Sequence, residues 1–153
     1  MSAAINPFDW RIVLLAKHAQ HVVLIHFPIA LYMAGVAADL LARATKREEF
    51  ATVAYWNMTL AAVFTVPVVA TGLVAWQWQL EGQKLKGILL YHLALALTSS
   101  VFIVLTWLVQ FMARRKNEIA STMVSVPLEI VGVLLITLTG HLGGFLSGVN
   151  SPS

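Results

Sequence analysis

Three histidines lie within apolar stretches of this chain: His26, His92 and His141. An imidazole in the hydrocarbon core of a membrane is costly and needs a partner, so such a residue is rarely idle. The same ring is a ligand for haem iron, zinc and copper. In a chain that crosses a membrane four times, the alternating helix directions bring all three to the same side. The three residues therefore predict a cofactor site near one membrane face.

The composition places these histidines in membrane helices. The chain has 153 residues, of which 59% are hydrophobic and 11% charged, unlike an ordinary soluble domain. Its uncharged or nearly uncharged stretches each reach the roughly 20 residues that cross a bilayer. We therefore predict an all-α fold, a four-helix transmembrane bundle, with spans at about 21–42, 51–78, 87–112 and 120–142.

The two ends of the chain are assigned to separate segments. Asp9, Arg11 and Lys17 interrupt the apolar pattern near the start, which favours a short interfacial amphipathic helix over a cleaved signal peptide. The predicted organisation is an N-terminal interfacial segment at 1–20, the bundle at 21–148 and a short polar tail at 149–153.

The basic residues predict the orientation. The loops after the first and third spans carry six, and the other side carries four: Arg11, Lys17, Lys84 and Lys86. By the positive-inside rule both termini and the histidines face outward. The expected location is a bacterial inner membrane, with the histidine cluster on its periplasmic side.

The absence of cysteine limits the chemistry. With no cysteine in the sequence, disulfides, thiolate zinc sites, cysteine-held iron–sulfur clusters and covalently attached haem are excluded. No nucleotide-binding loop or nucleophile elbow is present either, which argues against phosphoryl transfer and hydrolysis. A redox cofactor would be held by histidine, and non-covalent haem b is the leading candidate.

The choice of axial ligands follows from the order of the helices. A haem in a four-helix bundle takes its ligands from facing helices, and spans one and three are diagonal. His26 and His92 are therefore the favoured pair, with His92 and His141 second. His141 could instead hydrogen-bond a propionate or a quinone. A second haem would have to recruit His21 and His141 as well. Glycines that would let backbone approach a flat ring are Gly35, Gly72 and Gly143.

Two other interpretations of the histidines stay open. They could only hydrogen-bond helices together, in a cofactor-free structural or assembly subunit. They could also bind zinc or copper in a metal-responsive or transport protein. Against this, the HxxxH and HExxH spacings are missing. His21 and His26 are also separated by about 140° around a helix.

Two acidic residues lie within or beside the spans. A carboxyl group at the depth of Glu129 is energetically costly in the membrane. Glu129 therefore has a function, in a proton path or in contact with a partner helix, or it forms a hydrogen bond to a neighbouring helix of the bundle. The second interpretation is favoured, with Asn57 or Thr59 as the expected partner. Asp39 is expected to reach the interface or to pair with Arg43, four residues later.

Four motifs in order resemble a bacterial membrane family known as domain of unknown function 2231. That family opens with His-Pro-x-x-Val-His-Phe-Pro, followed by an aspartate matched here by Asp39. Its second helix ends in Gly-Leu-x-Asp-Trp, its third begins with a histidine, and its fourth ends in Gly-His-Leu-Gly-Gly or Gly-Trp-Leu-Gly-Gly. The matching residues are His21–Pro28, Gly72–Trp76, His92 and Gly140–Gly144.

The resemblance covers roughly residues 20 to 148 and implies a four-helix membrane protein, some members of which are suspected b-type cytochromes. Val22 and Ala75 depart from the family pattern, where proline and aspartate are usual. The expected function is a non-catalytic subunit of an electron-transfer complex. It would carry electrons between a partner redox protein and quinone or another haem. The expected partners are membrane lipid, the other subunits of the complex and a quinone, with no nucleic acid.

Overall fold

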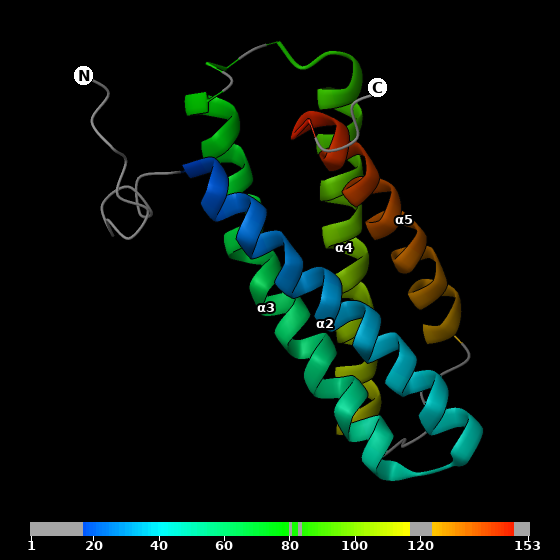
Figure 1. Cartoon of the computed structure of the whole chain (residues 1–153). Coiled ribbons are helices and arrows are strands. Elements are labelled where there is room, and N and C mark those ends of the chain that lie inside the picture. The colour runs from blue at the N-terminus through cyan, green and yellow to red at the C-terminus, as the bar shows by residue number, and fades with distance from the viewer. Residues whose placement is uncertain (1–16, 80, 83, 117–123, 149–153) are drawn as a thin grey trace.

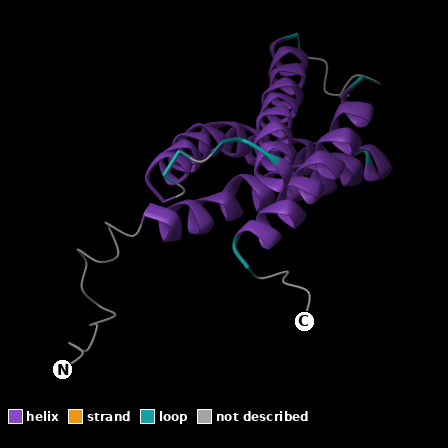
Figure 2. Cartoon of the chain, turned by 90° about the horizontal axis from the view of Figure 1, so that it is seen from above, coloured by secondary structure: helices purple, strands orange, loops and turns teal. Residues whose placement is uncertain are grey.

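The computed structural model describes residues 17–79, 81–82, 84–116 and 124–148. That part of the chain forms four helices and no strand (Figures 1 and 2). The all-α prediction is confirmed. Most of the predicted interfacial segment and all of the polar tail lie outside the described residues. The helices are α2 (Lys17–Thr45), α3 (Glu48–Gln79), α4 (Gly87–Arg115) and α5 (Ser125–Leu146).

Each helix is long and apolar enough to cross a membrane. The helices extend past the predicted spans, because hydropathy marks the apolar middle while helical hydrogen bonding continues into the polar flanks. α2 begins at Lys17 rather than at residue 21. α5 ends at Leu146 rather than at 142, so His141 lies more than one turn before the end of this helix. The predicted start of the fourth span, at 120, lies outside the described residues.

The helices pack as two hairpins. α2 packs along α3 and α4 along α5, α3 and α4 join the two hairpins, and α2 touches α5 at few points. Residues 46–47 connect α2 to α3, with Lys46 in the left-handed region at φ 56°, a conformation that often ends a helix. Alternating directions bring the starts of α2 and α4 and the end of α5 together at one end of the bundle (Figure 1).

The middle of the bundle closes around a small core. Tyr32 and Met58 are fully buried, and Ile103 and Ile136 are 4% exposed. Gly35 allows Met58 to approach, since a Cβ on it would lie 3.1 Å from the Met58 Cε atom. Gly35 therefore serves packing between α2 and α3. It does not line the cavity described below, so the structure gives no support to its predicted place beside a cofactor.

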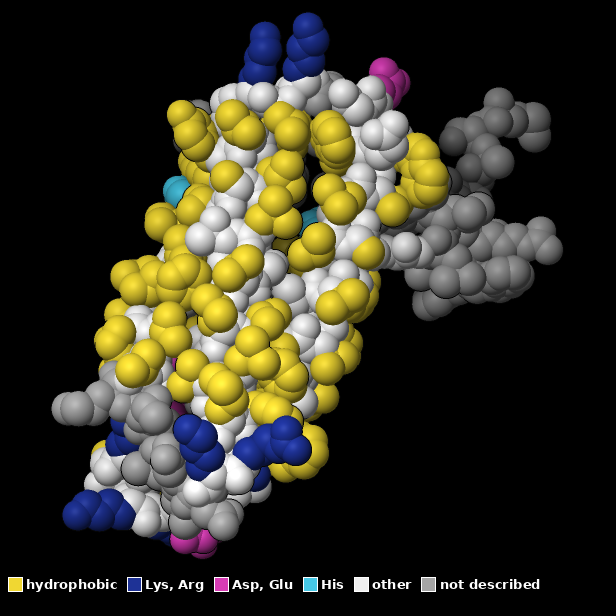
Figure 3. Space-filling model, turned by 180° about the vertical axis from the view of Figure 1, so that it is seen from behind, with side chains coloured by type: hydrophobic (Ala, Val, Ile, Leu, Met, Phe, Trp, Pro, Cys, Tyr) yellow, Lys and Arg dark blue, Asp and Glu magenta, His cyan; other side chains and the backbone are white. Residues whose placement is uncertain are grey.

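The outer surface of the helices is apolar. Large hydrophobic side chains such as Val66, Val63 and Leu134 are more than half exposed. On the face shown in Figure 3, lysine and arginine gather at the two ends and hydrophobic side chains cover the length between them. Such a surface suits lipid in the middle and water at both ends. The protein is a multi-pass membrane protein.

Candidate functional site

A cavity of about 790 Å³ opens between the four helices at the histidine end. This volume lies in the range of roughly 300–1,000 Å³ that is usual for ligand and cofactor sites. Most of its lining is aliphatic, with a few polar side chains among them. The polar and aromatic lining residues are His21, His26, Thr65, Trp76, His92, Ser99, Ser100, Thr139 and Ser147.

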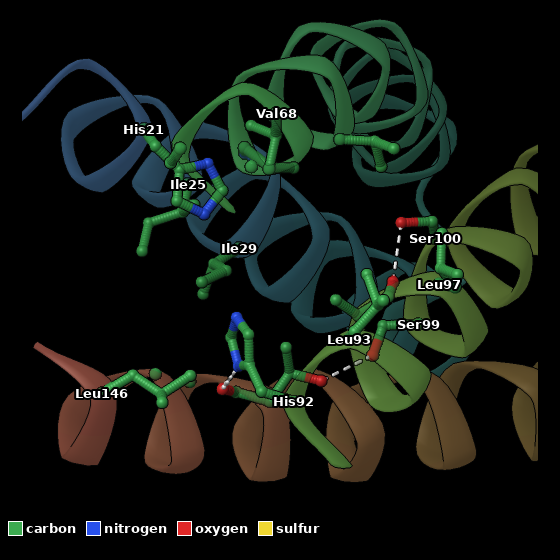
Figure 4. Close-up of a pocket in the computed structure, with 18 of the residues that line it drawn as sticks. His21, Ile25, Ile29, Val68, His92, Leu93, Leu97, Ser99, Ser100 and Leu146 are labelled. Atoms are coloured by element: carbon green, nitrogen blue, oxygen red, sulfur yellow. Dashed lines mark hydrogen bonds between the residues drawn. The ribbon is translucent and has the colours of Figure 1, made fainter. Parts of the chain in front are cut away.

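His92 on α4 is held by a hydrogen bond to α5. Its Nδ1 lies 3.1 Å from the backbone oxygen of Thr139, and since a carbonyl only accepts, Nδ1 is the donor. The Nε2 atom has no hydrogen-bond partner in the described part of the chain, and Figure 4 shows it pointing into the cavity. A ring fixed through Nδ1 with an available Nε2 is the usual arrangement of a metal-ligating histidine.

A second hydrogen bond joins α4 and α5 beside His92. Thr139 uses its own hydroxyl to bond Ser99 on α4, with the oxygens 3.0 Å apart. Ser99 in turn donates to the backbone oxygen of Leu95. Thr139 thus bonds α4 through both its backbone and its side chain. This fixes the depth and rotation at which the His92 ring enters the cavity.

His21 on α2 is held in a similar way by α3. Its Nδ1 lies 3.2 Å from the hydroxyl oxygen of Thr71. The Thr71 hydroxyl donates to the backbone oxygen of Pro67, at 2.8 Å. Because that hydroxyl has only one hydrogen, the His21 Nδ1 donates to Thr71. A neutral His21 ring therefore carries its proton on Nδ1 and its acceptor lone pair on Nε2.

Each of these two rings rests against a glycine of the neighbouring helix. A Cβ on Gly72 of α3 would come within 2.9 Å of the His21 Cε1 atom. A Cβ on Gly143 of α5 would come within 3.2 Å of the His92 Cε1 atom. Each hairpin thus supplies one ring to the cavity, His21 from α2 and His92 from α4 (Figure 4). Each ring packs against a glycine of the neighbouring helix. Gly72 and Gly143 line the cavity, and each of them contacts one of these two histidines.

The other histidines are placed differently. His26 is at the exposed edge of the cavity, and its Nδ1 is 2.7 Å from the backbone oxygen of Val22 on its own helix. His141 is exposed, contacts Phe145 edge-on and does not line the cavity. The geometry therefore favours His21 over the predicted His26 as the counterpart of His92.

The described residues contain no group of three or more histidine or acidic side chains that could hold a metal ion. Zinc sites normally use three or four protein ligands. Three histidines line the cavity, and the set held there by neighbouring helices is the pair His21 and His92. This set does not favour the zinc or copper interpretation.

A second polar cluster lies near the other end of the bundle. Asp39 pairs with Arg43, with an N–O distance of 2.7 Å, as predicted. The predicted partners of Glu129 are wrong, because Glu129 accepts instead from the Gln110 Nε2 of α4, at 3.3 Å. Asn57 bonds its own helix, and Thr59 accepts from a tryptophan. Gln110 is the only Asn or Gln in the uncharged part of α4, a signal that could have identified it.

A comparison with protein families identifies the family of this chain. A family model described as Predicted membrane protein (DUF2231) matches residues 17–150. No curated protein and no solved structure matches the chain. The matched range takes in all four helices and every residue of the cavity. The chain therefore belongs to the DUF2231 family of membrane proteins.

Proposed function

We propose that this protein is a membrane b-type cytochrome subunit that binds one haem b in the cavity, with His21 and His92 as axial ligands. The observation that carries the proposal is the pair of imidazoles at the cavity. Each is fixed through Nδ1 by a neighbouring helix and seated on a glycine. A haem supplies one-electron chemistry when bound. The chain's own part is to hold, orient and shield it.

The residues around the cavity suit such a group. Two imidazoles complete the coordination of an iron whose other four ligands come from a porphyrin, whereas zinc would need further protein ligands. The aliphatic lining suits the apolar macrocycle. Leu85 lines the cavity beside the exposed Lys84 and Lys86, and these cations favour propionates at the membrane surface.

The proposed partners follow from the position of the cavity. It lies at the end of the bundle that the basic-residue count predicts to face outward, which would be the periplasmic side of a bacterial inner membrane. A redox protein docking on that face would exchange electrons with quinone or another haem through this chain. The exposed His141 is on the same end, where it could contact a quinone headgroup or the docked protein. The chain would act as a non-catalytic subunit of an electron-transfer complex.

A second candidate function is a structural or assembly subunit without a cofactor. The bonds from His21 to Thr71 and from His92 to Thr139 each join two helices. Interhelical hydrogen bonds of this kind stabilise membrane bundles without any ligand. This alternative leaves the 790 Å³ cavity to be filled by lipid or by a neighbouring subunit.

A visible spectrum separates the two candidates. The gently solubilised protein is reduced with dithionite, the spectrum of the oxidised protein is subtracted, and haem is quantified as pyridine haemochrome. We expect a sharp α band and about one haem b per chain, as for a bis-histidine site. A flat spectrum from folded, freshly prepared protein would favour the structural subunit.

Replacing Gly72 by alanine is expected to lower haem content several-fold. The new Cβ would lie 2.9 Å from the His21 Cε1 atom, so the imidazole ring must move away from its position against Gly72. Alanine favours helix over glycine, so α3 itself is retained. The measurement is haem per chain beside far-ultraviolet circular dichroism. Val66→Ala on the same helix is the control, because this side chain is 71% exposed and does not line the cavity. Equal haem content in the two variants would contradict the role of Gly72 in positioning the His21 ring.

A further inference from the structure

Two carboxyl groups are buried together near the end of the bundle opposite the histidines. Glu129 on α5 is 1% exposed and Asp39 on α2 is 5% exposed. Both lie within candidate membrane spans, where an ionised carboxylate is costly unless its charge is balanced. The cluster plays no part in the proposed haem site.

The charges around this pair do not balance. Arg43 on α2 pairs with Asp39 at 2.7 Å and donates to the Ser125 hydroxyl at 2.6 Å. Gln110 on α4 is neutral, and the Tyr32 hydroxyl is bonded to a threonine. The acidic residues that begin α3, Glu48 and Glu49, are exposed. Among the described residues, two carboxylates therefore face one guanidinium, which leaves one negative charge in excess.

The hydrogen bonds of Glu129 show what is missing. Its Oε1 accepts from Gln110, while its Oε2 is buried with no hydrogen-bond donor among the described residues. The Asp39 and Glu129 carboxyl groups are close enough to bond each other. Two ionised carboxylates cannot form that bond, because each of them only accepts. A buried acceptor without a donor is costly.

We propose that Asp39 and Glu129 together form a binding site for a single proton. A proton on the pair supplies the missing donor between the two carboxyl groups. It also cancels the excess charge, leaving one carboxylate against Arg43. One ligand thus accounts for both the charge balance and the hydrogen-bonding pattern of the cluster.

The surroundings indicate the side from which the proton enters. The Arg43 side chain is 29% exposed and lies in the last turn of α2, so it connects the pair to water at that end. In the other direction, buried Ile103 and Ile136 lie in the core and at the inner limit of the cavity. The proton therefore exchanges with the membrane face opposite the histidines.

Infrared spectroscopy of the full chain in lipid nanodiscs tests the site. A protonated carboxyl group gives a C=O stretching band, separate from the carboxylate bands, that shifts in deuterium oxide. At neutral pH we expect such a band in the unaltered protein. We expect it to be lost in E129Q, which keeps the side-chain volume and the neutral state, and to be unchanged in the control E48Q.

A second variant covers the possibility that E129Q does not fold. In D39N the remaining Glu129 loses its carboxyl partner, so the band should change in frequency or disappear. In the control E48Q the band should again be unchanged. The proposal is overturned if the unaltered protein shows no such band at neutral pH. It is also overturned if the band persists unchanged in folded E129Q.

Discussion

Replacing His92 by alanine is expected to reduce haem content to less than about a tenth of that of the unaltered protein, since even outer-shell changes cost 10–100-fold in metal affinity. The variant removes the imidazole whose Nε2 points into the cavity. It also removes the bond between α4 and the Thr139 backbone. The readouts are pyridine haemochrome per chain and the reduced-minus-oxidised spectrum.

Three further variants identify the second ligand. His21→Ala is expected to lose haem to a similar extent as His92→Ala. His141→Ala removes an exposed ring outside the cavity and should keep full haem content. His26→Ala is the informative comparison, because its ring bonds its own helix at the cavity edge. If His26→Ala lost the haem and His21→Ala retained it, the axial pair would be His26 and His92, contrary to our assignment.

Folding must be checked separately in these variants. The His92 bond joins α4 and α5, so its loss could destabilise the bundle by about 0.6–2 kcal/mol, the range measured for membrane hydrogen bonds. Helix content and gel-filtration behaviour in detergent report this loss without reference to haem. A folded, haem-free variant supports a ligand role, whereas a variant that retains its haem spectrum rules that role out.

The fold could be predicted from the sequence because the length of an uncharged apolar stretch is enough to identify a membrane span. Uncharged stretches of about 20 residues leave few alternatives to helices. Alternating direction then places His21, His26, His92 and His141 at one end, whatever the details of packing. Depth in the membrane is thus readable from position along the chain.

The rotation of each helix could not be predicted in the same way. A helix that is apolar on nearly every side has no strong polar face to fix its orientation. Whether His21 or His26 is held at the cavity by a neighbouring helix depends on that rotation. Here Thr71 and Gly72 of α3 contact His21. The hydrogen bond between Gln110 and Glu129 could not be predicted from the sequence for the same reason. Two residues on different helices can bond only if both helices have the right rotation about their axes.

Small residues show the same limit. Gly35, Gly72, Gly132 and Gly143 all look alike in the sequence, as sites where backbone can approach. In the structure Gly35 receives Met58, two of the others receive histidines, and Gly132 receives Tyr32. The large side chain that fills each space comes from another helix, so the role of a glycine is decided by its neighbour.

Replacing Gly132 by alanine is expected to destabilise the bundle by about 1–3 kcal/mol, the usual cost of overpacking a well-filled core. A Cβ at this position of α5 would overlap the hydroxyl group of Tyr32 on α2. Tyr32 is fully buried and bonds Thr106 on α4 at 3.0 Å. Moving its ring would break a bond that joins two helices, at the place where α2 and α5 meet.

The measurement is the thermal unfolding midpoint in detergent, followed by circular dichroism. Gly140→Ala on the same helix is the matched control, because it adds a methyl group to open space and gains up to about 1 kcal/mol of helix propensity. Alanine at 132 should therefore lower the midpoint while alanine at 140 leaves it unchanged or raises it. The double variant Tyr32→Phe with Gly132→Ala should recover part of the loss, since the overlapping oxygen is gone. Equal midpoints for the two single variants would show that α2 and α5 do not meet at Tyr32 and Gly132.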